Sequence, residues 1–331
     1  MTSKIVTYQF RKKHPCPWLS GFIQAAAKDF DLIIEEFDET KQYDPDTVFT
    51  LEPKDYRKKV YPQWFHNHKI IINLNGESFA DPWIDLYSED KNILFIYGSK
   101  PVHTPLNNVI FTPHFFWIDT CWEWINNNTN TYIPKKTYNK KFLMPVRNIH
   151  GAQAEWKPYV FNKLRDKLDN ALYSYWDEDI FLPGDAQGKV QTQNGVREIR
   201  YDWFDDTYYS LTLESYYSHL KPVFLTEKIY KPLAFYHPFM VIGAPGILTE
   251  LEELGFQTFE NLFDQSYDTV PDIDDKLEII RNNIDNFKYT EYDTLTWEKV
   301  THNHNTFFDK EKIIKMTIDE FIIPTINWIN S

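Results

Sequence analysis

Short runs of consecutive apolar residues, separated by segments with helical spacing, constrain the fold of this chain most strongly. Ile70, Ile71 and Ile72 form one such run, and a strand that is apolar on both faces belongs in a parallel sheet covered by helices on each side. Runs of this kind predict strands at residues 4–10, 32–36, 47–51, 69–74, 93–97 and 108–111. Residues 20–29 have the apolar spacing of a helix. We therefore predict an α/β fold.

A polar stretch that contains proline divides the 331-residue chain into two such series. Residues 126–141 read NNNTNTYIPKKTYNKK, a composition typical of an inter-domain linker. After it, the patterns predict strands at 142–146, 208–213 and 238–242, with helices at 157–172, 226–236 and 247–254. We predict an N-terminal lobe over 1–130, a C-terminal lobe over 141–310 and a C-terminal helix over 311–331 that packs on the lobes. Pro324 is expected to break or kink that helix.

The formal net charge of −13 limits the partners of the chain. A surface this acidic repels nucleic-acid phosphates and anionic membranes, but it still allows a local basic site for a small phosphorylated ligand. The apolar runs are too short to span a membrane, and the first residues read as a strand rather than a signal peptide. Two cysteines, Cys16 and Cys121, indicate no disulfide framework and favour a reducing compartment. We expect a cytoplasmic protein with no membrane partner.

The most informative stretch is TYYSLTLES at 207–215, followed by TEKIYKPL at 226–233. Thr226 is a good N-cap for a helix, and Glu227 at the first helical position complements the positive end of that helix. Lys228 is unusual, because a cation in the first turn faces partial charge of the same sign. A bound anion would explain it, since a helix N-terminus beside a lysine suits a diphosphate. The alternative is a lysine that simply extends into solvent.

The apolar strand predicted at 238–242 runs into a Gly-Ala-Pro-Gly turn. Gly243 and Gly246 either let the backbone approach a ligand closely or merely shape the turn. The turn matches neither the GxGxxG pattern of dinucleotide-binding folds nor a Walker loop. The sequence therefore supports neither a dinucleotide-binding fold nor a kinase fold.

The order TLES, TEKIYKPL and an apolar strand that ends in a glycine-proline turn resembles the alpha-1,3-fucosyltransferases. Their pattern is roughly FENS, a spacer, and then TEK followed by an aromatic residue, a small helix and an apolar strand. The same region, about residues 208–267, is also similar to glycosyltransferases encoded by tailed phages, which carry TEKxYKP. The resemblance implies a GT-B fold, in which two Rossmann-like lobes have a cleft between them. It implies a cytoplasmic enzyme of a bacterium or a virus-infected host cell.

The resemblance also implies the reaction. A sugar, fucose-like or another hexose or pentose, passes from a nucleoside diphosphate sugar to a hydroxyl of a glycan or another acceptor. A base takes the proton of that hydroxyl, while positive groups surround the departing diphosphate. We expect an inverting transfer that needs neither a metal nor a cofactor, with a GDP-sugar as the favoured donor.

Carried over residue by residue, the resemblance assigns a donor site to the C-terminal lobe. Glu227 would accept hydrogen bonds from the ribose hydroxyls of the donor, and Lys228 would pair with its diphosphate. Glu214 matches the glutamate of FENS and would position the sugar or the nucleotide. Ser215 stands where the family has asparagine, and this difference leaves the donor sugar open.

Arg147 follows the strand predicted at 142–146, where basic residues of the family bind the donor phosphates. A guanidinium suits this task, because it forms two parallel hydrogen bonds with a phosphate and keeps its charge. The alternative is a loop arginine paired with Glu155 or Asp206. Thr226 and Gly243 complete the predicted set of donor-binding residues.

A glutamate and a histidine of the N-terminal lobe are the candidates for the catalytic base. Glu77, in IIINLNGESF, follows a buried strand and a glycine, and the phrase resembles the glycine-glutamate segment that carries the proposed base of the family. Its alternative is a glutamate at a helix N-terminus with no chemistry. His14, in HPCPW after the first strand, ranks second, because many histidines near prolines are structural.

Metal-binding patterns in the sequence are weak. Asp177 and Asp179 form a DxD pair of the kind that holds a divalent metal in one-domain transferases, and Asp272 and Asp274 form another. In a chain this acidic, we favour solvated loop carboxylates. The His-x-His pairs at 66–68 and 302–304 have no third ligand at a suitable spacing, so we predict no metal site.

Two other functions fit the same sequence. One is a phage DNA-modifying glycosyltransferase that acts on hydroxylated pyrimidines, although the net charge disfavours nucleic acid as a partner. The other is a non-catalytic carbohydrate- or nucleotide-binding protein on the same scaffold. Binding to DNA at low salt would favour the first, and donor binding without turnover would favour the second.

Overall fold

The structure is a computed structural model, and it describes residues 3–7, 21–51, 64, 67–74, 90–97, 108–146, 155–183, 200–217 and 223–331. Contacts between Cα atoms divide the chain into two compact units, Met1–Glu123 with Asp309–Ser331 and Trp124–Phe308. The C-terminal segment therefore belongs to the first unit. Among the described residues, no helix is both long enough and apolar enough to span a membrane.

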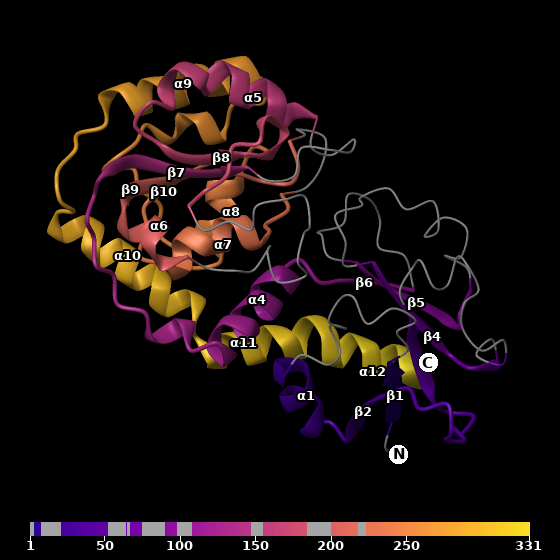
Figure 1. The fold of residues 1–331 in the computed structure, drawn as a ribbon. Helices are drawn as coiled ribbons and strands as arrows, with labels where there is room; N and C mark the ends of the chain where they lie inside the picture. The colour runs from indigo at the N-terminus through magenta and orange to yellow at the C-terminus, as the bar shows by residue number, and fades with distance from the viewer. Residues whose placement is uncertain are drawn as a thin grey trace. The chain divides into compact units, whose positions relative to one another are not determined.

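Six parallel strands form the sheet of the first unit, in the order β2-β1-β3-β4-β5-β6 (Figure 1). They are β1 (Ser3–Thr7), β2 (Leu32–Glu36), β3 (Val48–Leu51), β4 (Ile70–Leu74), β5 (Ile93–Tyr97) and β6 (Val109–Phe111). These strands confirm the ones predicted from the apolar runs. Residues 8–10 of the first predicted strand lie outside the described residues. At every other strand end of this sheet, the predicted and observed end residues differ by one position at most.

Both faces of this sheet are buried. Phe49, Ile70 and Phe95 belong to an apolar cluster on one face. Ile71 and Leu94 alternate with them along the strands, and they are buried as well. Consecutive apolar residues are therefore needed in these strands, which explains why the runs predicted them correctly.

The helices of the first unit come from both parts of the chain that form it. They are α1 (Gly21–Lys28), α4 (Phe115–Asn126), which continues into the second unit, α11 (Lys310–Thr317) and α12 (Ile323–Asn330). α1 contacts α11, and the ammonium of Lys69 donates to the carbonyls of Trp328 (3.0 Å) and Ile329 (2.9 Å). The interruption predicted at Pro324 is a π-helical turn, Ile318–Ile322, just before this proline. Such a turn accommodates a residue that lacks an amide N–H.

Four parallel strands form the sheet of the second unit, in the order β10-β9-β7-β8. They are β7 (Lys140–Val146), β8 (Leu172–Tyr175), β9 (Thr207–Leu213) and β10 (Phe239–Ile242). In both sheets, the first strand of the unit pairs with the second strand on one side and with the third on the other. The strand order therefore reverses between β7 and β9. Ligands of parallel α/β sheets commonly bind beyond the carboxyl ends of the strands at such a reversal. The two units are compatible with Rossmann-like lobes.

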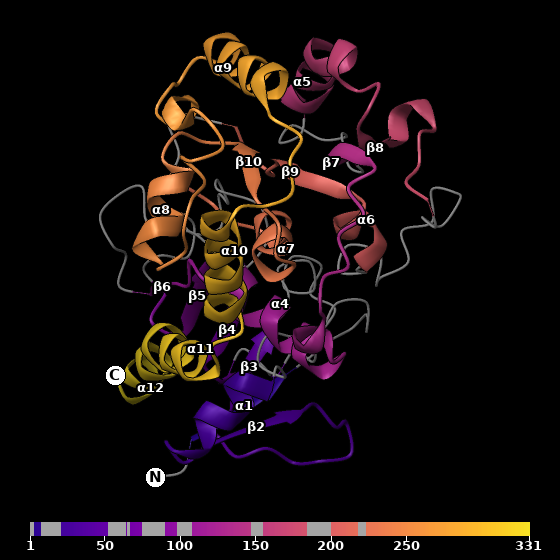
Figure 2. The ribbon, with the colours of Figure 1, turned by 90° about the vertical axis from the view of Figure 1, so that its left-hand side faces the viewer.

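Helices cover both faces of the second sheet. Figures 1 and 2 show α5 (Trp156–Leu164) and α9 (Ile273–Asn286) on one face, with α6 (Tyr201–Asp205), α7 (Glu227–Ala234) and α8 (Ile247–Glu253) on the other. α10 (Thr294–Phe307) contacts α7. Shorter 3-10 turns lie at Thr129–Thr131, Arg165–Lys167, Trp176–Glu178 and Gln265–Asp268. The helices predicted at 226–236 and 247–254 are confirmed.

The helix predicted at 157–172 is wrong in its last part. The helix ends at Leu164, and Leu172 begins β8. Leu164 and Leu168 are both buried at helical spacing. A turn at Asp169 and Asn170, two residue types that favour turns, then separates them from the strand. The apolar residues keep a four-residue spacing from Leu164 to Leu172, so this spacing does not show where the helix ends and the strand begins.

The stretch predicted as a linker is bonded to the second unit. The amide of Thr137 donates to the carbonyl of Asp205 (2.8 Å), and the amide of Lys140 donates to the carbonyl of Asp206 (2.8 Å). Tyr132 donates its hydroxyl to the carboxylate of Asp205. The boundary between the units falls earlier, within α4. This helix is missing from the sequence predictions, because its many aromatic residues obscure the helical spacing.

Candidate functional site

The predicted site residues divide into those that the structure describes and those that it does not. Glu77, His14 and Arg147 lie outside the described residues. The others lie where β9 and β10 end and where α7 begins: Glu214, Thr226, Glu227, Lys228 and Gly243.

Glu214, the first residue after β9, is almost fully buried (1% exposed). Its carboxylate accepts from the hydroxyl (2.6 Å) and the amide (3.2 Å) of Thr226 and from the amide of Ser215 (3.1 Å). Burial raises the pKa of this carboxyl, and the charge of Lys228 and the Thr226 hydrogen bonds offset only part of that effect. Glu214 therefore ties the end of β9 to the start of α7.

Lys228, in the first turn of α7, folds its ammonium back onto the start of the helix. The ammonium donates to the hydroxyls of Ser215 (3.0 Å) and Thr226 (3.3 Å) and to the carboxylate of Glu227 (2.9 Å). The hydroxyl of Thr226 accepts from the amide of Lys228 (3.3 Å), which confirms the predicted N-cap. The side chain of Lys228 is 28% exposed. The ammonium thus lies beside the positive end of the helix and does not extend away from it.

Glu227 begins α7 and supplies a second buried carboxylate, with 7% of its side chain exposed. Burial by itself raises the pKa of Glu227, but the charges of Lys228 and Lys231 outweigh burial and hold this pKa below its ordinary value. An ionised carboxylate accepts hydrogen bonds and donates none. Glu227 is therefore suited to hold hydroxyl groups of a ligand.

The glycine turn after β10 packs directly against this cluster. A Cβ atom on Gly243 would lie 3.1 Å from the Cβ of Glu214 and 2.5 Å from the Cδ1 of Ile247. Gly246 has a φ of 90°, a left-handed conformation that residues with side chains rarely adopt. Gly243 is therefore required for close approach, and Gly246 is required for the shape of the turn.

A carboxylate that the sequence analysis missed lies at the N-terminus of α8. Asp268 is 4% exposed and accepts from the amide of Leu248 (3.1 Å). Burial raises the pKa of Asp268, and the amides at the start of α8 and the charge of Lys276 offset only part of that effect. An anion of the protein itself therefore takes the place of a ligand anion at this helix end. No local motif reveals it, because Asp268 is distant in sequence from α8.

The two alternative partners of Arg147 lie in different parts of the second unit. Asp206 directly precedes β9, and Glu155, at the start of α5, is exposed. Because Arg147 lies outside the described residues, its predicted role and both alternatives stay predictions.

The DxD pairs have different positions. Asp272 caps α9 by accepting from the amide of Asp274 (2.8 Å), and the carboxylate of Asp274 pairs with Lys163 (2.9 Å). Asp177 and Asp179 are both exposed. The pair at 272 and 274 therefore serves the start of a helix and its neighbour on α5.

The histidines of α10 contact backbone carbonyls. His302 contacts the carbonyl of Gly255 (2.8 Å), and His304 contacts that of Ala234 (2.7 Å). His66 lies outside the described residues. Within the described ranges, no three or more His, Cys, Asp or Glu side chains are grouped so that they could hold a metal ion.

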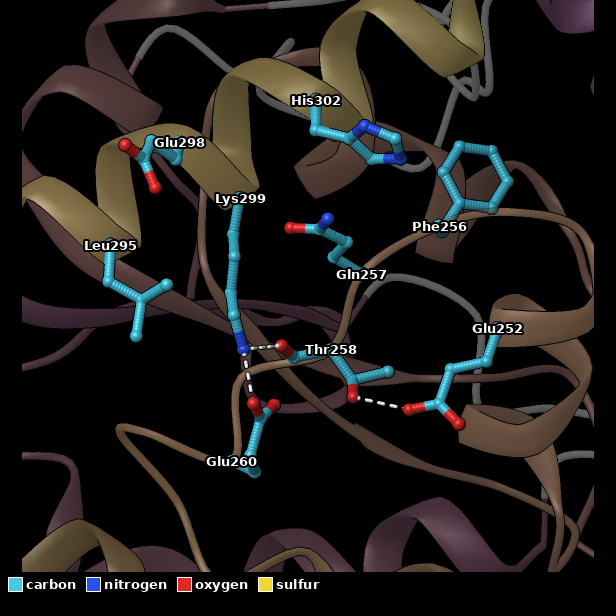
Figure 3. Close-up of a pocket in the computed structure, with 9 residues that line it drawn as sticks. All are labelled: Glu252, Phe256, Gln257, Thr258, Glu260, Leu295, Glu298, Lys299 and His302. Atoms are coloured by element: carbon cyan, nitrogen blue, oxygen red, sulfur yellow. Dashed lines mark hydrogen bonds and ion pairs between the residues drawn. The ribbon is translucent and has the colours of Figure 1, made fainter.

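A cavity of about 620 Å³ lies elsewhere in the second unit and is lined by none of the predicted site residues (Figure 3). Glu252, Glu260 and Glu298 line it together with Lys299. Figure 3 shows the ammonium of Lys299 directed toward Glu260 (2.6 Å) and the carbonyl of Thr258 (2.8 Å). Three carboxylates face a single ammonium here, and their net negative charge repels phosphate, so this cavity does not suit a nucleotide.

A scan of the chain against models of protein families found no match, and a search of curated proteins found none either. The evidence for a function is therefore the side-chain cluster at the ends of β9 and β10, which includes Glu227 and Lys228. Glu227 presents an ionised acceptor for hydroxyl groups, and Lys228 presents a cation at the positive end of a helix. A ligand that carries both hydroxyls and phosphates suits this arrangement.

Proposed function

We propose that the second unit binds a nucleoside diphosphate sugar and that the protein is a glycosyltransferase of the GT-B type. The observation that carries the proposal is the ammonium of Lys228, held at the N-terminus of α7 between Ser215 and Glu227. Glu227 already pairs with this ammonium (2.9 Å), and a helix N-terminus beside a lysine suits a diphosphate. β9 also ends beside the reversal of strand order, where such sheets bind ligands. The two parallel α/β units support the GT-B assignment.

Each residue of the cluster has a role in the proposed complex. Lys228 pairs with the diphosphate, and the carboxylate of Glu227 accepts from the ribose hydroxyls. Glu214 already accepts from Thr226 and Ser215, so it holds the two loops together and acts as a positioning residue. In this proposal, Lys228 rather than a carboxylate-bound metal meets the charge of the diphosphate.

In the proposed transfer, the acceptor hydroxyl oxygen attacks the anomeric carbon of the donor and forms the new bond with inversion. The bond between that carbon and the phosphate oxygen breaks, and the departing diphosphate keeps the electron pair. Lys228 neutralises part of the charge that develops there. Glu77 is the proposed base that takes the hydroxyl proton, ahead of His14, and both lie outside the described residues.

A thermal-shift screen with GDP, UDP, ADP, CMP and their sugars tests donor binding. A ligand at about 100 times its dissociation constant adds about 2.7 kcal/mol of stability, which is readily measured. We expect a shift with one nucleoside diphosphate that EDTA does not change. Lys228→Ala is expected to weaken that ligand at least about tenfold. Lys163→Ala, which removes an exposed ion-paired lysine of the same unit, is the matched control and leaves the affinity unchanged.

Two results would count against the proposal. No shift with any nucleotide would contradict the donor site, and a shift that EDTA abolishes would point to a metal at Asp177 and Asp179 instead. Catalysis is tested separately by donor hydrolysis in the wild type and in Glu77→Ala. Donor binding with no turnover in either protein would favour a non-catalytic carbohydrate- or nucleotide-binding protein.

A further inference from the structure

Lys276, on α9, is a buried lysine whose ammonium has a single hydrogen-bond partner in the described part of the chain. The residue is 0% exposed, and its ammonium donates to the carbonyl of Gly243 at 3.1 Å. The ammonium also lies 5.5 Å from the ring centre of Tyr217. Because an ammonium carries three N–H donors, two remain without an acceptor among the described residues.

No carboxylate pairs with this ammonium in the described part of the chain. The negative charge of Asp268 acts on Lys276, but no ion pair joins the two side chains. The carboxylate of Asp268 is engaged instead by the amide of Leu248 (3.1 Å). A buried charge without a paired counter-charge is costly, and such groups mark candidate functional sites.

The position of Lys276 connects it to the cluster at the ends of β9 and β10. Gly243, to which it donates, packs so closely on Glu214 that a Cβ atom would lie 3.1 Å from that residue. The ring of Tyr217, in the loop after β9, contacts the ring of Trp156 at the start of α5 (5.7 Å between centres). The indole N–H of Trp156 is buried and has no hydrogen-bond partner among the residues that the structure describes. Two side chains with unsatisfied donors therefore lie around Tyr217.

We propose that Lys276 is a second cation of the donor site and binds the diphosphate of the nucleotide together with Lys228. The inference rests on the proposed function for the identity of the ligand, whereas the unsatisfied donors themselves indicate an anion. Tyr217 is half-buried and lies over the ammonium, so its ring moves aside when phosphate binds. That movement breaks one hydrogen bond, from its hydroxyl to the carbonyl of Pro271 (2.8 Å), which a charge-assisted bond to phosphate outweighs.

Anion binding at this position is coupled to protonation of the lysine. Burial lowers the pKa of Lys276 to about 8, and the charge of Asp268 offsets only part of that effect. Among the described residues, the phenol of Tyr217 also faces the ammonium, and burial raises the pKa of this phenol to about 12. A bound phosphate stabilises the charged ammonium and raises the pKa of Lys276. The protein therefore takes up protons when it binds phosphate at pH 8.5.

Titration calorimetry with inorganic pyrophosphate at pH 8.5 tests the inference on the full chain. Runs in two buffers with different ionisation enthalpies give both the affinity and the number of protons taken up. Lys276→Met removes the charge, and Lys276→Arg makes it permanent. Lys299→Met replaces another buried lysine of the unit, one that is paired with Glu260, and is the matched control. Pyrophosphate carries no nucleoside, so the result does not depend on which nucleotide the protein uses.

We expect the wild type to take up more protons than Lys276→Arg, because protons taken up by pyrophosphate itself are common to both proteins. Lys276→Met is expected to bind at least about tenfold more weakly, with Lys299→Met unchanged. The two Lys276 variants differ in size and charge, so failure of one to fold leaves the other as the test.

Equal proton uptake by the wild type and Lys276→Arg, equal affinity of Lys276→Met, or no binding of pyrophosphate by the wild type would each overturn the inference. These results leave the proposed function standing if a nucleoside diphosphate still binds through Lys228. Conversely, proton uptake that depends on Lys276, with no binding of any nucleoside diphosphate, would uphold the anion site and reject the proposed donor.

Discussion

β9 and β10 are each followed by a loop and a helix, α7 and α8. The two helices differ in the group that accepts hydrogen bonds from their first amides. At the start of α7, the neutral hydroxyl of Thr226 accepts from the helix, and the ammonium of Lys228 lies beside it. At the start of α8, the buried carboxylate of Asp268 accepts from the helix. The first amides of α7 are capped by a neutral hydroxyl, with the pair of Glu227 and Lys228 beside it, whereas a buried carboxylate caps α8.

This difference shows that glycines alone do not identify the turn that binds phosphate. The β10 turn carries Gly243 and Gly246, the residue type expected where a backbone approaches a ligand. These glycines instead allow close packing and a left-handed turn, and Asp268 fills the helix end. The proposed anion site combines Lys228, which is paired with Glu227, and Lys276, which forms no ion pair with a described residue.

Asp268→Ala has the largest expected effect and tests whether α8 depends on an internal anion. The change removes a buried acceptor of the Leu248 amide and a negative charge near Lys276. We expect the free energy of unfolding, measured by urea denaturation, to fall by about 2–3 kcal/mol. Asp272→Ala, which removes an exposed cap from α9, is the control and is expected to cost about 1 kcal/mol. Equal losses of unfolding free energy in Asp268→Ala and Asp272→Ala would contradict this expectation, because a buried carboxylate would then stabilise its helix no more than an exposed one.

Gly243→Ala tests whether the two turns are coupled through Glu214. Its Cβ would lie 2.5 Å from the Cδ1 of Ile247 and 3.1 Å from the Cβ of Glu214, so we expect the free energy of unfolding to fall by about 1–2 kcal/mol. Because Glu214 would be displaced, we expect the affinity for the nucleotide to fall as well. Gly246→Ala would have its nearest neighbour at 3.7 Å but a strained φ of 90°. It is expected to lose about 1–2 kcal/mol of stability and no affinity. Thermal melts with and without nucleotide measure both quantities, and the same affinity in both variants would contradict the coupling.

Thr226→Ala has the smallest expected effect and measures the neutral cap of α7. It removes the acceptor of the Lys228 amide and the donor to Glu214, so the free energy of unfolding is expected to fall by about 1 kcal/mol. Thr226→Ser keeps the hydroxyl and should stay within about 0.5 kcal/mol of the wild type in urea denaturation. If Thr226→Ala lost as much stability as Asp268→Ala, a neutral and a charged cap would be equivalent here.

The fold was predictable where burial on both sides of a sheet forces apolar residues into consecutive positions. β4 and β5 were found for this reason, because Ile71 and Leu94 are buried as completely as Ile70 and Phe95. The end of α5 was predicted wrongly, because the apolar spacing of this helix continues through Leu168 to Leu172, the first residue of β8. It also missed α4, whose aromatic residues obscure a helical period.

Local chemistry predicted the part of the candidate site at the start of α7, and the order of motifs along the chain added Glu214 and Gly243. Thr226, Glu227 and Lys228 form one motif, and the cap at Thr226 follows from the local chemistry of a helix start. Asp268 and Lys276 carry no such motif. They reach the β10 turn from segments that follow α8, and their importance appears only through burial and missing partners.

By itself, the sequence determined the α/β character of the chain, most of its strands and the helix start at Thr226, because periodicity and capping depend on residues that are close along the chain. Only the tertiary structure decided that Lys228 folds back onto its helix, that Asp268 caps α8 and that Lys276 is buried with no paired carboxylate among the described residues. The direction of a side chain and the balance of a buried charge are set by groups that folding brings together from distant segments.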